Sequence, residues 1–368
     1  MMTKHNFRLL DIYTDYLLSS FGATTATGLS RLLPELSHDQ VTRMLAQQPL
    51  TDRDLWQIVK PQVRQVQSEE AVLIIDDTVE EKPYPPKGHP DESELISWHY
   101  DHSQSRTVKG INLLSALYLS RDVSLPVAFE LIQKTILTTD PKTGKDKWVA
   151  AQTKNELARQ MIGAVKKKQI PFRYVLADIW FSSAENMVFI KQTAHKEFIM
   201  PLKSNRRVAL SRNDLRRGRW TCLSSLNFSA QASYTLYLES VPFPVRVVRE
   251  VFKNEDGTEG FLLLCSSDLS LSGTALFPIY QKRWKVEEYH KSLKSNAALA
   301  KSPTKLPHTQ QNHIFASLVA FIKLESYRCA THLNHFALKA KLYHGAIQAA
   351  FEQLQQLKNS YPKVAITS

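Results

Sequence analysis

The spacing of apolar residues is helical in the first 65 positions of the chain. A capping box at Ser37 opens one short helix after a break at Pro34. Two short helices with a tight joint are typical of a helix-turn-helix, and a plain helical subdomain explains the same pattern equally well. A further helix is expected to begin near Asp52 and to stop before Pro61, because proline lacks a backbone donor.

From residue 71 the pattern changes to buried strands that alternate with helices. Residues 72–75 form a continuous apolar run, which is typical of a strand buried on both faces. Strands are expected at 112–119, 125–132, 173–177 and 197–202, helices at 152–167 and 183–193, and a proline-rich loop at 82–92. Interleaved strands and helices predict an α/β layer structure.

Residues 204–266 have a β-rich texture, and the chain is again helical from residue 272 onward. We therefore divide the chain into three consecutive segments. These are a helical region at 1–68, a mixed α/β region at 69–300 that contains the β-rich stretch, and a helical region at 301–368.

Charge changes this picture because it is unevenly distributed. The chain of 368 residues carries a net charge of +12, yet residues 1–70 hold seven Lys and Arg against eight Asp and Glu. Seven basic residues lie between 203 and 219, and seven more lie between 282 and 305. Such runs are usually solvated faces, but two of them in a basic chain favour a polyanion partner such as nucleic acid.

Several classes of protein have no support in the sequence. No apolar run approaches the ~20 residues of a membrane span, and no signal-peptide pattern is present. The three cysteines are far apart and lack a metal-binding spacing, which favours a reducing cytoplasm. Neither a Walker-type glycine-rich loop nor a Gly-x-Ser-x-Gly motif occurs, so nucleotide hydrolysis and serine esterase chemistry are not indicated.

Carboxylates follow two of the expected buried strands. Asp76 and Asp77 come directly after residues 72–75, and Asp178 comes directly after residues 173–177. Ligands of open α/β sheets bind outside the carboxyl ends of strands, where two acids could share a hard cation such as Mg²⁺. Acids also end strands simply because loops are polar.

A third acid lies on a helix with an unusual polar face. At about 100° per residue, Tyr280, Arg283, Glu287 and Lys294 fall within about 60° of one another. This stripe suits a metal-binding carboxylate flanked by phosphate-binding groups. An ordinary i,i+4 ion pair between Arg283 and Glu287 explains the geometry equally well.

The spacing of this stripe, with gaps of two, three and six residues, resembles the Y-R-E-K signature of the IS-four family of bacterial insertion-sequence transposases, enzymes of the DDE class. The surrounding string RWKVEEYHKSLK is similar to that family beyond the four positions. The strings IIDDT and VLADIWFSS also resemble its two aspartate motifs, and the resemblance covers roughly residues 71–305.

The resemblance implies an RNase H-like mixed-sheet catalytic core interrupted by a β-rich insertion, with helical N- and C-terminal regions. Asp77, Asp178 and Glu287 would bind two divalent cations, Mg²⁺ or Mn²⁺. Asp77 is preferred to Asp76 because the family's aspartate directly precedes a threonine, here Thr78. The strand pattern itself does not decide between the two, since both of its faces are apolar.

The implied function is that of a DDE transposase, which cleaves double-stranded DNA at terminal inverted repeats and joins the 3′-OH ends to target DNA. A metal-dependent nuclease that does not join DNA and a noncatalytic DNA-binding relic or repressor are the alternatives. A homodimer on DNA is implied, with helices at 314–322 and 346–357 as candidate contacts. The implied location is the bacterial cytoplasm, in association with the nucleoid.

Five further residues are expected to contact DNA. Arg283 and Lys294 would hold phosphates, Tyr280 would hydrogen-bond or stack, and the sequence places Lys203 and Arg207 in the basic run that would line the DNA path. For Trp180, two residues after Asp178, packing in the core is favoured over a base-stacking platform.

Overall fold

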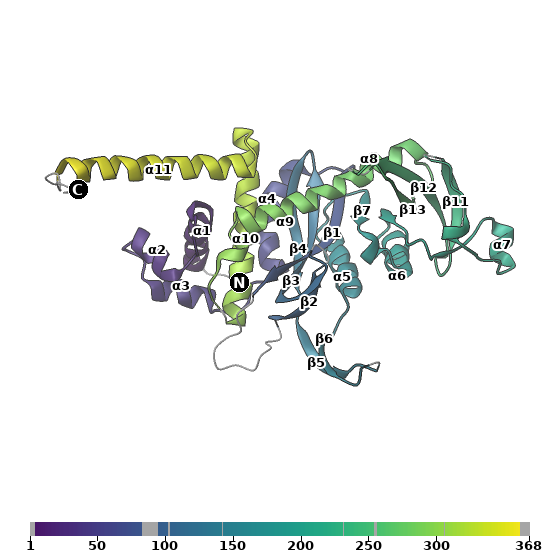
Figure 1. Ribbon diagram of the computed structural model, residues 1–368, viewed down its shortest axis with the longest axis horizontal. Helices are drawn as coiled ribbons and strands as arrows, with labels where there is room; N and C mark the ends of the chain where they lie inside the picture. Colours follow the sequence, from purple (N-terminus) through teal and green to yellow (C-terminus); the bar gives the residue numbers. More distant parts are fainter. Residues whose placement is uncertain are drawn as a thin grey trace. The chain divides into compact units, whose positions relative to one another are not determined.

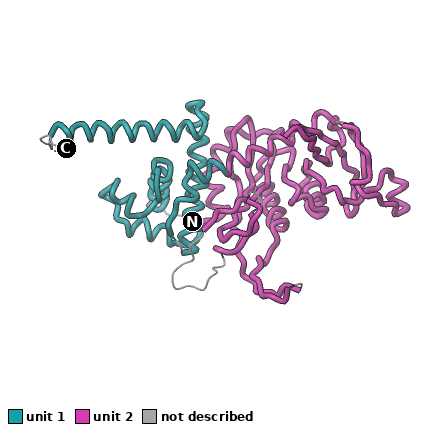
Figure 2. Tube along the Cα trace, in the orientation of Figure 1, with its two compact units in different colours: residues 1–49, 291–368 teal, residues 50–290 magenta. Residues whose placement is uncertain are grey.

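The computed structural model contains two compact units (Figures 1 and 2). The first comprises residues 1–49 and 291–368, and the second comprises residues 50–290. The structure describes residues 4–82, 95–101, 104–141, 143–230, 232–253, 256–304 and 306–360. Apart from residue 82, the expected proline-rich loop at 82–92 lies outside these residues.

The first unit is helical and joins the two ends of the chain. Because α1 packs against α10, this unit combines residues from both ends of the chain. It therefore does not coincide with any of the segments 1–68, 69–300 and 301–368 that the sequence suggests. Its α-helices are α1 (Lys4–Ser19), α2 (Ala26–Leu32), α3 (His38–Leu45), α10 (Pro307–Thr331) and α11 (His335–Ser360). None of the described helices is long and apolar enough to cross a membrane.

Helix α10 forms the core of this unit. His313 contacts the hydroxyl of Tyr13 at 2.9 Å and the carbonyl of Ala298 at 2.9 Å, and the residues of 314–322 are all buried. The prediction that 314–322 is a contact helix for a second copy is therefore wrong. Its apolar side chains are already covered within the unit, a state that an apolar pattern alone cannot distinguish from an interface.

The second unit begins with α4 (Asp52–Val66), which continues through Pro61. The predicted stop before this proline is wrong. The buried face of α4, formed by Leu55, Val59 and Val63, packs against β4. That burial offsets the roughly 3 kcal/mol that a proline costs inside a helix.

Five strands give this unit its RNase H-like core, in the spatial order β4-β3-β1-β7-β8. Strand β1 is antiparallel to β3 and parallel to β7, and β7 is parallel to β8. The five strands are β1 (Val72–Glu81), β3 (Arg106–Ser120), β4 (Val123–Leu131), β7 (Tyr174–Ala177) and β8 (Glu197–Pro201). The predicted α/β fold class is confirmed, with α5 (Lys154–Lys167) and α6 (Ala184–Val188) connecting the strands.

The β-rich stretch at 204–266 extends this same sheet. Strand β13 pairs antiparallel with β8, and the sheet continues through β12, β11, β9 and β10 (Figure 1). The added strands are β9 (Arg207–Ala209), β10 (Thr221–Cys222), β11 (Ser233–Leu238), β12 (Pro244–Lys253) and β13 (Glu259–Ser266). At the opposite edge, β2 (Ser97–Asp101) pairs with β3, and β5 (Lys134–Thr139) and β6 (Asp146–Ala150) form a separate hairpin.

The sequence analysis treated the polar stripe as one face of a continuous helix. The helix that carries Glu287 is instead interrupted. A 3₁₀ turn, η4 (Lys282–Trp284), separates α8 (Gly273–Gln281) from α9 (Lys285–Ser295). The turn tightens the backbone between Tyr280 and Glu287, so the stripe passes over three short segments.

Strand β1 is the most sensitive place to remove apolar volume. Leu73 is fully buried at the centre of the sheet, and Leu73→Ala should lower the free energy of unfolding by about 2–5 kcal/mol. Urea denaturation measures this loss. Leu210→Ala, at a half-exposed leucine of the same unit, serves as the control and should change it by less than about 0.5 kcal/mol. Equal losses in the two variants would contradict this account of the core.

Candidate active site

Two acids meet where the parallel pairing of β1 with β7 ends. Asp178 directly follows β7, whereas Asp76 lies within β1, which continues to Glu81, so the prediction that this strand ends at residue 75 is wrong. Ile75 is in register with Ala177 across the parallel pair, so the next residues, Asp76 and Asp178, lie side by side. Burial, followed by repulsion from Asp178 and Asp77, raises the pKa of Asp76 to about 7. Burial also raises the pKa of Asp178. The strand ends thus concentrate negative charge that a cation would stabilise.

The tandem aspartates have different surroundings. Asp76 is in register with Ser115 on β3, and the hydroxyl of Ser115 lies 3.2 Å from that of Tyr289 on α9. Asp76 therefore shares a face of the sheet with α9, and its carboxylate lies 3.5 Å from Nη1 of Arg283.

Asp77 carries a different set of partners. Its Oδ2 accepts hydrogen bonds from Nδ2 of Asn112 at 2.8 Å and from Nζ of Lys154 at 2.7 Å. The sequence analysis missed both partners, because neither a strand asparagine nor a lysine at the start of α5 carries a distinctive motif. Asp76 thus lies on the side of Arg283 and Asp77 on the side of Asn112 and Lys154, while repulsion from Asp77 contributes to the raised pKa of Asp178.

Arg283 connects the strand ends to the helix that carries the third acid. Its guanidinium lies 3.5 Å from Asp76, and its Nη2 donates to Oε1 of Glu287 at 2.8 Å. The side chain of Arg283 is only 14% exposed, whereas that of Glu287 is 61% exposed. The predicted i,i+4 ion pair is thus present, and it extends to the first strand.

Tyr280 lies beneath this arginine and is not available to DNA in this conformation. Only 6% of its surface is exposed, and the guanidinium of Arg283 lies 5.8 Å from the centre of its ring. Burial raises the pKa of Tyr280 to about 12, so the phenol keeps its proton. The structure makes Tyr280 a support for Arg283 and leaves no face of its ring for a base.

The three basic residues expected to contact DNA lie in different places. Lys203 is exposed directly after β8, near Trp180, whereas Arg207 pairs with Glu239 at 2.9 Å. Lys294 is half-buried in the last turn of α9 and belongs to the unit formed by residues 1–49 and 291–368. Only Lys203 is therefore placed close to the second strand end within its own unit.

Trp180 is exposed, and the preference for core packing is wrong. The 3₁₀ turn η1 (Ile179–Phe181) follows Asp178 and leaves 48% of the Trp180 surface open, while Phe181 fills the core beneath it. A turn of three residues cannot bury all of its side chains, and the apolar run IWF gives no indication of which one faces outward.

The oxygen ligands present suit a divalent cation, although they do not form a finished site. Among the described residues, no three Asp, Glu, His or Cys side chains are grouped so that they could hold a metal ion. Asp76 and Asp178 provide two adjacent carboxylates, the ligands that hard cations prefer. Glu287 would complete the set after it exchanges Arg283 for the metal.

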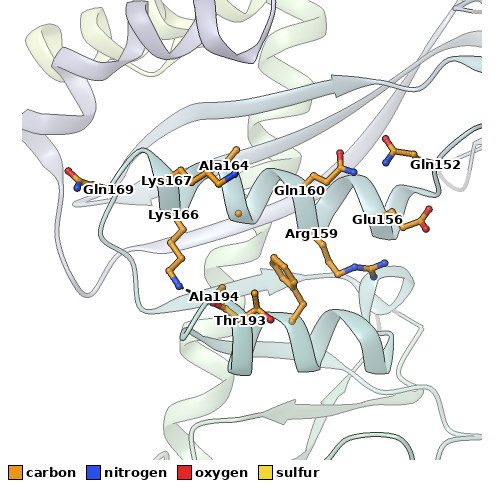
Figure 3. A pocket seen from close by; sticks show the side chains of 12 residues that line it. Gln152, Glu156, Arg159, Gln160, Ala164, Lys166, Lys167, Gln169, Thr193 and Ala194 are labelled. Carbon is orange, nitrogen blue, oxygen red and sulfur yellow. Dashed lines mark hydrogen bonds between the residues drawn. The ribbon is translucent and has the colours of Figure 1, made fainter.

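A separate groove of about 940 Å³ runs along α5 and the π-helical turn η2 (Phe189–Thr193) (Figure 3). Its lining includes no strand-end acid. Two cationic side chains of the lining already have hydrogen-bond partners within the chain. Arg159 donates to Asn186 at 2.7 Å, and Lys166 donates to the carbonyl of Thr193 at 2.9 Å. We interpret the groove as a gap between packed helices.

The crowding of acids at β1 predicts a pH-dependent stability. The folded-state pKa of Asp76, about 7, exceeds the unfolded value near 3.9, so its ionisation destabilises the fold as the pH rises between them. Asp76→Asn should therefore be more stable than the wild type at about pH 8, by up to about 4 kcal/mol, and equally stable near pH 4. Urea titrations in the presence of a chelator measure the difference, and an equal effect at both pH values would contradict it.

The comparisons with known proteins agree with this arrangement. The family model of the DDE superfamily endonucleases matches residues 2–225, more than half of the chain. This match includes Asp76, Asp77 and Asp178 and ends before Glu287. No curated protein matches the chain. With its RNase H-like sheet and two adjacent acids on neighbouring strands, the chain belongs to the DDE superfamily endonucleases, DNA-acting enzymes that generally use divalent metal ions.

Proposed function

We propose that this endonuclease is a transposase of the IS-four type, which cleaves DNA at the ends of an insertion sequence and joins the 3′-OH ends to target DNA. The observation that carries the proposal is the side-by-side placement of Asp76 and Asp178, with Glu287 linked to them through Arg283. The Y-R-E-K spacing from Tyr280 to Lys294 supports the subtype.

The proposed metal ligands are Asp178, Glu287 and one of the tandem aspartates. The resemblance to the family favours Asp77, whereas the register of β1 favours Asp76, and we propose Asp76. Two Mg²⁺ or Mn²⁺ ions held there would activate the attacking oxygen and stabilise the leaving 3′ oxygen of a phosphodiester.

The basic residues of the site would hold the DNA backbone. Arg283 contacts both Asp76 and Glu287, and with Glu287 serving as a metal ligand its guanidinium would be available to donate to a phosphate. Lys203 supplies a second, exposed cation near Asp178, and we retain Arg207 and Lys294 as weaker phosphate contacts. These contacts position the strand without reading its sequence.

Recognition of the inverted repeats is assigned to the N-terminal helices of residues 1–68. Since residues 1–70 are almost neutral, this recognition must depend mainly on contacts to bases or on DNA shape. The alternatives, a nuclease that does not join DNA and a noncatalytic relic, differ from the proposal in their reaction products.

Isosteric substitutions should show which of the acidic residues are needed for cleavage. Asp76→Asn, Asp178→Asn and Glu287→Gln should each reduce Mg²⁺-dependent cleavage of DNA carrying the flanking repeats by at least about 100-fold, because each removes a charged metal ligand. Binding of the same DNA in a chelator should stay within about 2-fold, as measured by gel shift. Asp77→Asn, which retains an oxygen acceptor for Asn112 and Lys154, is the matched control and should retain most of the cleavage.

The outcomes distinguish the candidates. Loss of cleavage in Asp77→Asn with retention in Asp76→Asn would return the assignment to Asp77. Cleavage without joined products in the wild type would support the nuclease. An absence of both cleavage and joining in the wild type would support the relic.

A homodimer on DNA is proposed through α11, within the candidate contact 346–357. Exposed apolar side chains recur along α11 at alternating spacings of three and four residues, which is the repeat of a coiled-coil seam. Because the stripe is continuous, a second copy of the helix would match it. The stripe consists of Phe336, Ala340, Tyr343, Ile347, Ala350, Leu354 and Leu357.

Negative charges in this stripe should prevent dimerisation through α11 and therefore the assembly of complexes that contain two DNA ends. Ile347→Glu with Leu354→Glu should abolish complexes that contain two DNA ends in sedimentation velocity, while binding of one end stays within about 2-fold. Gln356→Glu, on the opposite face of the same helix, is the control. Two-end complexes that persist in the double variant would exclude α11 as the interface.

A further inference from the structure

We propose that Trp180, Lys154 and Lys203 form a binding site for an unstacked nucleobase and its flanking phosphates, the Trp180 site. The inference rests on the proposed function, in which Asp178 lies beside the phosphodiester that is cut. The ligand is a DNA strand whose bases are no longer paired, because a base within a duplex cannot present its face to a side chain.

Exposure of the ring is the first argument. Trp180 leaves 48% of its surface open, and its neighbour Ile179 is 39% exposed. A tryptophan loses the favourable free energy of apolar burial when it is left this open. Trp148 is similarly exposed, so it is the position of the Trp180 ring next to a candidate catalytic acid that makes it available for a ligand contact.

The backbone holds the ring in place next to Asp178. Oδ1 of Asp178 accepts from the backbone N–H of Trp180 at 2.9 Å and from that of Phe181 at 3.4 Å. The hydroxyl of Ser182 donates to the carbonyl of Ile179 at 2.8 Å, and Phe181 is buried beneath the turn. The ring is thus presented on a fixed turn, which reduces the entropy that ligand binding would cost.

Positive charge at the ring is the second, independent argument. Nζ of Lys154, from α5, and Nζ of Lys203, from the segment after β8, each lie 5.9 Å from the centre of the Trp180 ring. This distance is at the outer limit of a cation–π contact, and Lys154 is also held by its ion pair with Asp77 at 2.7 Å. Lys203 is therefore the cation that a phosphate next to a stacked base would attract, and Lys154 adds positive charge beside the ring.

A nucleic acid strand fits this combination better than other ligands. Single-strand sites combine an aromatic face, which every base can stack on, with cations that follow the backbone. The Trp180 site has both, with the ring on a fixed turn and the cations on two neighbouring segments of a DNA endonuclease. It is expected to favour strands that have opened near the cut, with little preference for sequence.

Binding without metal tests this site directly. The probes are a fluorescein-labelled oligothymidylate of about 20 nucleotides and a blunt duplex of the same length, in a buffer with chelator. Trp180→Ala should weaken single-strand binding by about 10-fold to 100-fold, while duplex binding changes by less than about 2-fold. Trp180→Phe should restore most of the affinity because it retains a flat ring.

Trp148→Ala is the matched control, since Trp148 is also an exposed tryptophan of the same unit, on β6. It should leave binding of both probes unchanged. Trp180→Ala with unchanged single-strand affinity, or with equal losses on both probes, would overturn the proposal. Because Trp180 is exposed, its variants should keep the wild-type unfolding midpoint, which circular dichroism verifies.

The assay also separates this inference from the proposed function. If Asp178→Asn abolishes cleavage while Trp180→Ala binds single strands normally, the function stands and the Trp180 site is refuted. If Asp178→Asn cleaves DNA normally while Trp180→Ala loses single-strand binding, the function fails and the base-binding site stands.

Discussion

The parallel pairing of β1 with β7 is the constraint on which the candidate site depends. One register, with Ile75 opposite Ala177, places Asp76 and Asp178 at the same edge of a rigid sheet. The same placement is electrostatically costly, because burial raises the pKa of both carboxyls, Asp178 and Asp77 repel charge on Asp76, and Asp77 repels charge on Asp178. Protonation of Asp76 or a nearby cation would relieve this cost, and a cation there would suit the metal dependence that is general among DDE endonucleases.

Arg283 provides part of that cationic charge from within the chain. It lies between Asp76 and Glu287, supported from below by Tyr280. A metal ion and this guanidinium compete for the same carboxylate oxygens. Under the proposed function, Glu287 would hold the metal and Arg283 would then be available to a phosphate, so the two roles would depend on one ion pair.

Much of the fold was predictable from the sequence, but the details that decide the chemistry of the candidate site were not. The apolar runs 72–75 and 173–177 correctly predicted the buried parts of the two strands, and Asp178 follows the second as expected, but β1 continues through Asp76 and Asp77 to Glu81. The choice between Asp76 and Asp77 depends on the register of β1 with β3, which an all-apolar strand does not encode locally. The exposure of Trp180 likewise depends on the conformation of the turn after Asp178, which the spacing of apolar residues in the sequence does not predict.

The distribution of positive charge shows why clustering in sequence differs from clustering in space. The basic run 203–219 begins at Lys203, near Trp180, but it continues into β9 and α7 (Arg212–Arg216), at the end of the sheet remote from β2 (Figure 1). Arg207 is already paired with Glu239. Beyond about 10 Å, salt screens exposed charges, so most of this run can attract DNA but cannot hold the phosphate beside Asp178. Under the proposed function, the contacts that position a strand for cleavage would therefore come from cations that the fold brings beside Asp76 and Asp178, such as Arg283 and Lys203, from separate segments of the chain.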